Sequence, residues 1–66
     1  MEIFLNGKTR KVEKTCNIAN LLKELALENK RLAVEVNLEI IPRSQFDTYI
    51  FSKGDRVEIV QAIGGG

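Results

Sequence analysis

One stretch with helical periodicity lies between two stretches of alternating apolar residues, and this order limits the folds open to the chain. From Ile18 to Ala26, apolar residues recur three and four positions apart, as on one face of an amphipathic helix. On both sides of this stretch, apolar residues alternate with polar ones, as in half-buried strands. The chain has only 66 residues. It is therefore expected to form one small domain, with the helix across one face of a sheet.

The first twelve residues predict a β-hairpin. Glu2 to Leu5 and Lys8 to Val12 are extended in character, and the Asn6-Gly7 pair between them tolerates the positive φ angles of a type I′ turn. The alternation puts Ile3 on one face together with Met1 and Leu5. Phe4 is therefore expected on the opposite, polar face.

The predicted helix begins after an N-cap at Asn17, with Thr15 as the alternative cap, and ends near Glu28 or Asn29. Such a short helix needs its apolar stripe buried against the sheet, because helical propensity alone does not hold it.

A second hairpin, a helical turn and a last strand are expected after the helix. Residues 37–39 turn the chain from 32–36 into a short return strand, which Pro42 stops because it cannot donate to a ladder. Residues 56–63 form the last and most apolar strand. Residues 43–50 carry Phe46, Tyr49 and Ile50 at helical spacing. They are expected to form a helical turn that packs its aromatic side chains at one end of the core.

This order of elements favours a last strand in the middle of the sheet, parallel to the first, which is the β-grasp architecture. The predicted fold class is α+β, a ubiquitin-like β-grasp: a mixed sheet of four to five strands, one main helix across one face, and a short helical turn. The domain is expected to span residues 1–63, with a flexible glycine tail at 64–66.

The residue types exclude several activities. Ten Lys and Arg nearly balance nine Asp and Glu, so no strong field favours nucleic acid or a membrane as partner. The chain has no His, one Cys and no glycine-rich phosphate loop, so we expect no metal site, no catalytic residues and no enzyme. No secretion signal or membrane span is recognisable, and a cytoplasmic location is expected.

Three other features have a functional and a structural interpretation. Cys16 stands just before the helix, where a thiol can be activated, but a lone cysteine is more often a small buried apolar residue. Glu24 and Glu28 are more often a solvated helix face than an acid–base pair. A basic stripe on the first hairpin and its exit is more often solvated than bound to an acidic partner: Lys8, Arg10, Lys11 and Lys14.

Gly64, Gly65 and Gly66 end the sequence. At average glycine usage, three glycines in these positions arise by chance in roughly 0.03% of chains. Residues without side chains can enter a narrow channel and present an α-carboxylate there. A carboxylate is a poor electrophile until it is activated, for example as a mixed anhydride with AMP, and this chain has no phosphate site. We therefore expect a carrier or a tag activated by another protein, the alternative being an end without a role.

Five segments accompany these glycines, each weak alone: 3–7 (IFLNG), Leu21-Leu22, 34–37 (VEVN), 39–43 (EIIPR) and 54–60 (GDRVEIV). In this order, and over essentially the whole chain, they resemble the ThiS family of thiamine-biosynthesis sulfur carriers, which are small ubiquitin-like proteins.

The resemblance implies a cycle at Gly66. An adenylyltransferase of the ubiquitin-activating-enzyme-like family would adenylate its carboxylate with ATP and Mg, so no cofactor would be stably bound to this chain. A cysteine-desulfurase-derived persulfide would then supply sulfur for a thiocarboxylate, which donates it to thiazole synthase for the thiazole ring of thiamine. Gly64 and Gly65 would provide clearance in the partner's active site.

The resemblance also implies a docking patch, because related ubiquitin-like proteins use an apolar patch on the outer sheet face to dock the activating enzyme. If the first and last strands are neighbours, Phe4 is expected near Val60 and Ala62, and these three residues are the candidate patch. Unconnected surface apolar residues are the alternative.

Three other functions remain open. The sulfur-carrier subunit of molybdopterin synthase shares the fold and the diglycine end. A ubiquitin-like modifier would be joined through Gly66 to lysines of its targets, and a β-grasp binding module would have an inert tail.

Overall fold

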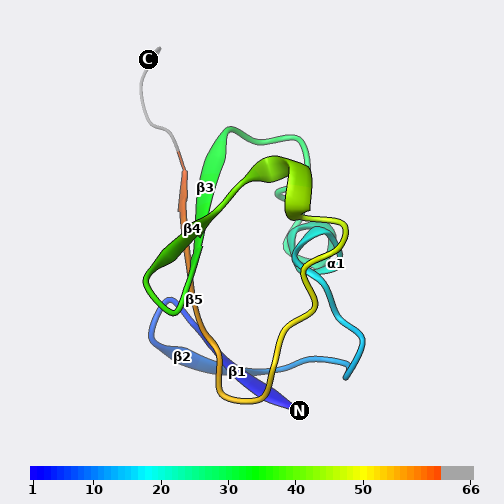
Figure 1. The fold of residues 1–66 in the computed structure, drawn as a ribbon, viewed down its shortest axis with the longest axis vertical. Coiled ribbons are helices and arrows are strands. Elements are labelled where there is room, and N and C mark those ends of the chain that lie inside the picture. Colours follow the sequence, from blue (N-terminus) through cyan, green and yellow to red (C-terminus); the bar gives the residue numbers. More distant parts are fainter. Residues whose placement is uncertain (62–66) are drawn as a thin grey trace.

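The computed structural model describes residues 1–61, which form a β-sheet with one helix against it (Figure 1). The elements follow the predicted order along the chain: β1 (Glu2–Leu5), β2 (Lys8–Lys11), α1 (Ile18–Glu24), β3 (Leu32–Val36), β4 (Glu39–Ile41), the 3-10 turn η1 (Arg43–Gln45) and β5 (Arg56–Gln61).

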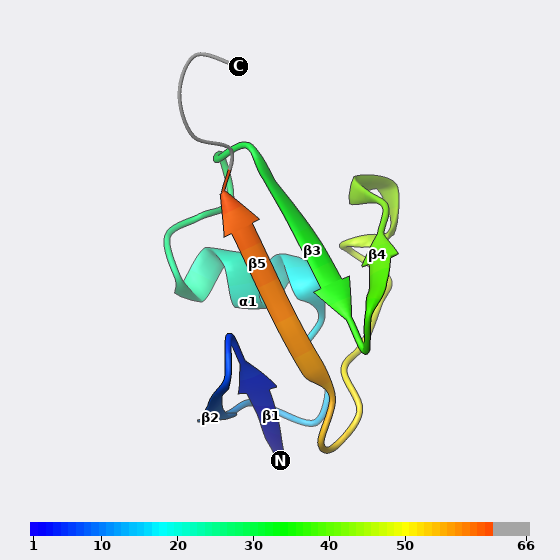
Figure 2. The same ribbon diagram turned by 90° about the vertical axis from the view of Figure 1, so that its left-hand side faces the viewer.

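The five strands form one mixed sheet in the order β2-β1-β5-β3-β4. The last strand, β5, lies in the middle, parallel to β1 and antiparallel to β3. Figure 2 shows α1 crossing behind the sheet. No other element of residues 1–61 covers the opposite face (Figures 1 and 2). The predicted β-grasp fold class and the central place of the last strand are confirmed.

The core lies between the sheet and α1. Ile3 is fully buried and Phe4 is exposed, as the alternation in the first strand predicts. The predicted stripe of the helix is buried over its first turns, at Ile18, Leu21 and Leu22. The sheet supplies buried side chains at the predicted alternating positions: Ile3, Val34, Val36 and Val57.

The helical turn predicted over residues 43–50 is shorter than expected, because η1 ends at Gln45 and the chain is extended at Ile50. Ile50 forms an isolated antiparallel bridge with Asn17, and neighbouring side chains in extended backbone point to opposite sides. Ile50 is exposed and Phe51 is buried in its place. The ring of Phe51 contacts Tyr49 edge-on, with 6.1 Å between the ring centroids.

The helix begins as predicted and ends earlier than predicted. The side-chain oxygen of the N-cap Asn17 accepts a hydrogen bond from the Asn20 amide at 2.7 Å. At the other end, Ala26 adopts a positive φ of 59°. Its amide donates to the Lys23 carbonyl, and the Leu27 amide donates to the Leu22 carbonyl. This is a Schellman motif, which ends α1 at Glu24.

Both hairpin turns place an asparagine with positive φ beside β5. Asn6 and Gly7 have φ values of 48° and 84°, as a type I′ turn requires, and the second turn repeats this geometry with Asn37 and Leu38 at 52° and 72°. The Asn37 side-chain oxygen accepts from the Arg56 amide at 3.0 Å, and its side-chain nitrogen donates to Asp55 at 3.0 Å. The two turns therefore hold the central strand from both sides.

Candidate functional site

The central strand leads toward the glycines that the sequence singles out. Gln61, the last described residue, still pairs with Leu32 of β3. The predicted site residues beyond it lie outside the described part of the chain: Ala62, Gly64, Gly65 and Gly66. The predicted boundary between domain and tail, at residues 63 and 64, lies there too.

The face of the sheet opposite α1, here called the open face, carries the other two predicted site residues. Phe4 is 41% exposed and Val60 is 61% exposed. However, Phe4 lies opposite Arg56, and Val60 lies opposite Ala33. Val60 is thus four residues further along β5, about 13 Å at the usual rise of a strand. The expectation that Phe4 lies near Val60 is wrong, because β1 enters its turn after Leu5 and does not run beside the second half of β5.

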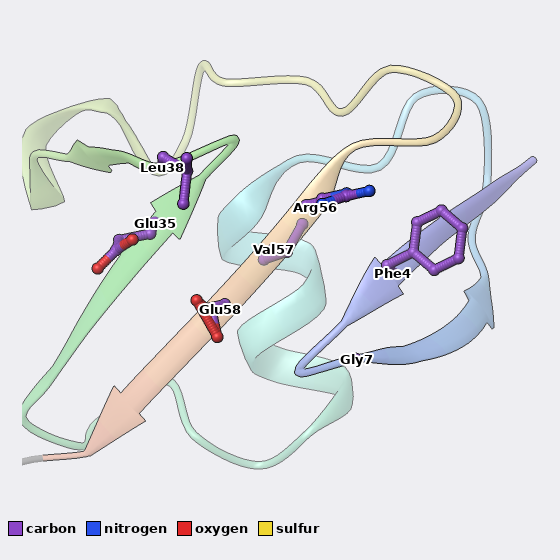
Figure 3. Close-up of a pocket in the computed structure, with 7 residues that line it drawn as sticks. All are labelled: Phe4, Gly7, Glu35, Leu38, Arg56, Val57 and Glu58. Carbon is purple, nitrogen blue, oxygen red and sulfur yellow. The ribbon is translucent and has the colours of Figure 1, made fainter.

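Phe4 instead lines a groove of about 380 Å³ on the open face, together with Gly7, Glu35, Leu38, Arg56, Val57 and Glu58. Figure 3 shows Phe4 and the extended Arg56 side chain on one side of the groove, and Leu38, Glu35 and Glu58 on the other. The sequence pattern alone does not reveal these neighbours of Phe4. The alternation along residues 56–60 places Arg56 and Glu58 on the face of Val60, but the strand register decides which of them lies beside Phe4.

Two carboxylates of the groove belong to one cross-strand pair. Glu35 of β3 lies directly opposite Glu58 of β5, and such partners have Cβ atoms about 5 Å apart on the same face. Within residues 1–61, the ion pair formed is Arg10 with Glu24, at 3.1 Å, and no cationic side chain pairs with Glu35 or Glu58. Adjacent like charges on a sheet are locally destabilising.

Cys16 is a buried residue of the core. It is 4% exposed and is a free thiol whose Sγ donates to the Asn17 carbonyl at 3.4 Å. Burial, reinforced by the negative charge of Glu24, raises the pKa of the Cys16 thiol. A raised pKa disfavours the nucleophilic thiolate, so the structure supports the interpretation of Cys16 as a small apolar residue.

Glu24 and Glu28 do not share a helix face. Glu24 is the last residue of α1, and Glu28 follows the Schellman motif. Glu24 pairs with Arg10 of the predicted basic stripe. Among residues 1–61, no three His, Cys, Asp or Glu side chains gather into a group able to hold a metal ion. Nor does this part of the chain contain a helix long and apolar enough to cross a membrane.

Within residues 1–61, the mixed sheet with β5 at its centre and one helix across it places the chain among the ubiquitin-like β-grasp proteins. The ThiS family model matches residues 3–66. The chain therefore belongs to the ThiS family, the sulfur carrier proteins of thiamine biosynthesis.

Known proteins are similar over the whole domain. The sulfur carrier protein ThiS of Bacillus subtilis is 43% identical over 94% of this chain and 96% of its own. A crystal structure of the thiamine biosynthesis protein ThiS from Geobacter metallireducens has 33% identity and a TM-score of 0.84, with both chains fully covered. A thiazole synthase of Paramagnetospirillum magneticum is 39% identical over all of this chain, which spans only 20% of that protein. The family prediction is confirmed.

Proposed function

We propose that this chain carries sulfur on its C-terminal glycine. The carboxylate of Gly66 attacks the α-phosphate of ATP in the active site of a partner adenylyltransferase, and pyrophosphate leaves. The outer sulfur of a cysteine-derived persulfide then attacks the acyl carbon and displaces AMP, which gives an acyl disulfide. A second thiol attacks the S–S bond of this acyl disulfide, forms a disulfide with the cysteine, and releases the thiocarboxylate of Gly66. The observation that carries this proposal is the match to the ThiS family, which extends through Gly66.

The strand that precedes the glycines is well supported in the described structure, as we expect for a carrier that presents its C-terminus to partners. β5 is the central strand and is held by β1 and β3 and by the side chains of Asn6 and Asn37. Beyond Gln61 the sequence continues with five residues, which span at most about 17 Å when extended. Gly64 and Gly65 would let such a segment enter a narrow active site, because they have no side chains.

The reaction is proposed to take place in the cytoplasm, with thiazole synthase as the recipient of the sulfur. The choice of recipient is supported by the thiazole synthase of Paramagnetospirillum magneticum, one fifth of which aligns with this entire chain. Proteins that act in succession gain from being linked, because a link raises the local concentration of each for the other.

We further propose that the adenylyltransferase docks on the open sheet face, where Phe4 and Val60 are exposed. Adenylation of Phe4→Ala, measured as ATP–pyrophosphate exchange, should show a raised KM. An unchanged KM would remove Phe4 from the docking surface.

Reconstitution tests the whole cycle. The full chain is incubated with the adenylyltransferase, ATP, Mg²⁺ and a cysteine desulfurase with cysteine, and its mass is measured. Replacement of one oxygen by sulfur is expected, and deletion of Gly66 should abolish it while the thermal unfolding curve stays unchanged. Conjugates of higher mass from the native cell would indicate a modifier instead, and an unaltered chain would contradict both.

A further inference from the structure

The groove on the open face combines features that work against the stability of the isolated domain. Leu38 has a φ of 72° and is 87% exposed. The first hairpin has Gly7 at the corresponding turn position, and glycine adopts this conformation without the steric cost of a side chain. Leu38 therefore exposes a large apolar side chain to solvent at a position where the backbone conformation favours glycine.

Glu35 and Glu58 are a second unfavourable feature of the same groove. They lie directly opposite each other, and within residues 1–61 no cationic side chain pairs with either of them. Arg56 lines the groove as well, but its side chain extends toward Phe4 and away from the two carboxylates (Figure 3). On this side of the groove, the apolar side chain of Leu38 therefore lies beside the two negatively charged carboxylates of Glu35 and Glu58.

Departures from local preference in a folded domain concentrate at functional sites, where a partner supplies the missing contacts. A side chain that satisfies this side of the groove must be positively charged at its end and apolar along its length. Arginine and lysine have this form, because a methylene stem carries the charged group.

We propose that the groove docks the adenylating partner by receiving one of its arginine or lysine side chains, with the charged end between Glu35 and Glu58 and the stem against Leu38. The inference rests on the proposed function for the identity of the partner. The groove itself, its charge and its exposed leucine are features of the described chain.

The position of the groove suits a carrier. It lies at the start of β5, beside Arg56, whereas the glycines follow the end of that strand at Gln61. The five steps from Arg56 to Gln61 cover about 17 Å. A partner can therefore hold the groove while its active site works on Gly66, and the docking contacts are not changed by the reaction.

The first test is the double variant Glu35→Gln/Glu58→Gln in full-length chain, assayed by ATP–pyrophosphate exchange with the purified adenylyltransferase. Loss of both carboxylates should raise KM for the carrier by about tenfold or more and leave kcat unchanged, because the charges act in docking and not in the reaction. The matched control is Glu13→Gln/Glu28→Gln, which removes the same charge from exposed positions outside the groove. The control should keep the KM of the natural chain.

The second test is Leu38→Gly, which removes the apolar side chain and favours the backbone of the turn. It should raise both the midpoint of thermal unfolding and KM. If Leu38 had a purely structural role, Leu38→Gly would raise the midpoint of thermal unfolding and leave KM unchanged.

The outcomes separate the proposals. If the natural chain is adenylated and the groove variants share its KM, the docking site is overturned while the proposed function stands. If the natural chain is not adenylated, the proposed function fails and the assignment of the groove to this partner fails with it. A dimer of the chain alone in sedimentation experiments, dissociated by Glu35→Gln/Glu58→Gln, would overturn the proposal in favour of a second copy as occupant.

Discussion

The side chain of Asn6 hydrogen-bonds both backbone groups of Ile59, 53 residues away. Its oxygen accepts from the Ile59 amide at 2.9 Å, and its nitrogen lies 3.5 Å from the Ile59 carbonyl oxygen. Backbone pairing between β1 and β5 ends at Leu5, opposite Val57. The side-chain amide of Asn6 thus acts as the next rung of the ladder and extends the support of β5 toward the end that leads to the glycines.

Asn6→Ala should lower the free energy of unfolding by about 1–2 kcal/mol, because it removes these bonds and replaces asparagine, which tolerates a positive φ, by alanine, which tolerates it less well. Asn6→Gly is the matched control, since it removes the bonds and accepts the backbone angle. Urea denaturation should rank the natural chain above Asn6→Gly, and Asn6→Gly above Asn6→Ala. Hydrogen exchange at Ile59 should be faster in both variants, and unchanged exchange there would contradict the ladder interpretation.

Asp55 should be one of the most sensitive polar positions. Its carboxylate is buried and accepts from the Ser52 amide at 2.8 Å and from the Asn37 side chain at 3.0 Å. Asp55→Ala leaves both donors without this acceptor and should lower the free energy of unfolding by about 2–3 kcal/mol. Asp47→Ala, at an exposed position, should change it by less than about 0.5 kcal/mol. Equal effects of the two substitutions in urea denaturation would contradict this role of Asp55.

The sequence predicts those parts of the fold that local chemistry determines. The Asn6-Gly7 turn, the Asn17 cap and the alternation around Ile3 each depend on a few adjacent residues, and all are present in the structure. The helix end was not predictable in this way. Ala26 has high helical propensity, yet it takes a positive φ so that Leu27 can pack against the core.

The candidate site shows the same limit. Alternation alone placed Phe4 on the open face, which the structure confirms. Its neighbours depend on the register between β1 and β5, which pairs Phe4 with Arg56 and not with Val60. Register between strands more than fifty residues apart is set by the packing of the whole domain, so the groove and the Glu35–Glu58 pair become visible only in the structure.

Cys16 should make the domain less stable in alkali. Burial and the negative charge of Glu24 raise the pKa of the folded thiol above the ordinary value of 9.0. As pH rises past 9.0, the unfolded chain therefore loses the thiol proton before the folded chain does, so the free energy of unfolding falls. Below 9.0 both states keep the proton and this contribution is constant.

Cys16→Ala removes this titration, so its free energy of unfolding should decline less steeply above pH 9.0. Some decline should remain, because burial also raises the pKa of Tyr49 above 10.0. Urea denaturation across this pH range gives the slope for each chain. The slope is the relevant quantity, since the smaller side chain also leaves a cavity that lowers stability at every pH. Equal slopes would show that the Cys16 thiol titrates alike in both states.

Glu58→Gln should stabilise the isolated domain, because it ends the repulsion across the strand pair with Glu35. The expected gain in the free energy of unfolding is about 0.2–1 kcal/mol at low salt, and it should shrink as salt screens the charges. Glu13→Gln, an exposed residue outside the sheet, serves as the control and should show no such gain. A loss of stability in Glu58→Gln would mean that Glu58 makes a favourable contact that offsets the repulsion.

Ala26→Gly should stabilise the domain at the end of α1. The left-handed conformation at 59° costs an L-residue about 1–2 kcal/mol, and part of this is regained in glycine despite its greater freedom in the unfolded chain. We expect a net gain of about 0.5–1 kcal/mol in urea denaturation. Ala19→Gly, inside the helix, is the matched control and should lose about 1 kcal/mol. Losses of similar size at both positions would show that Ala26 is not strained, and opposite signs would support the Schellman ending through Leu22 and Leu27.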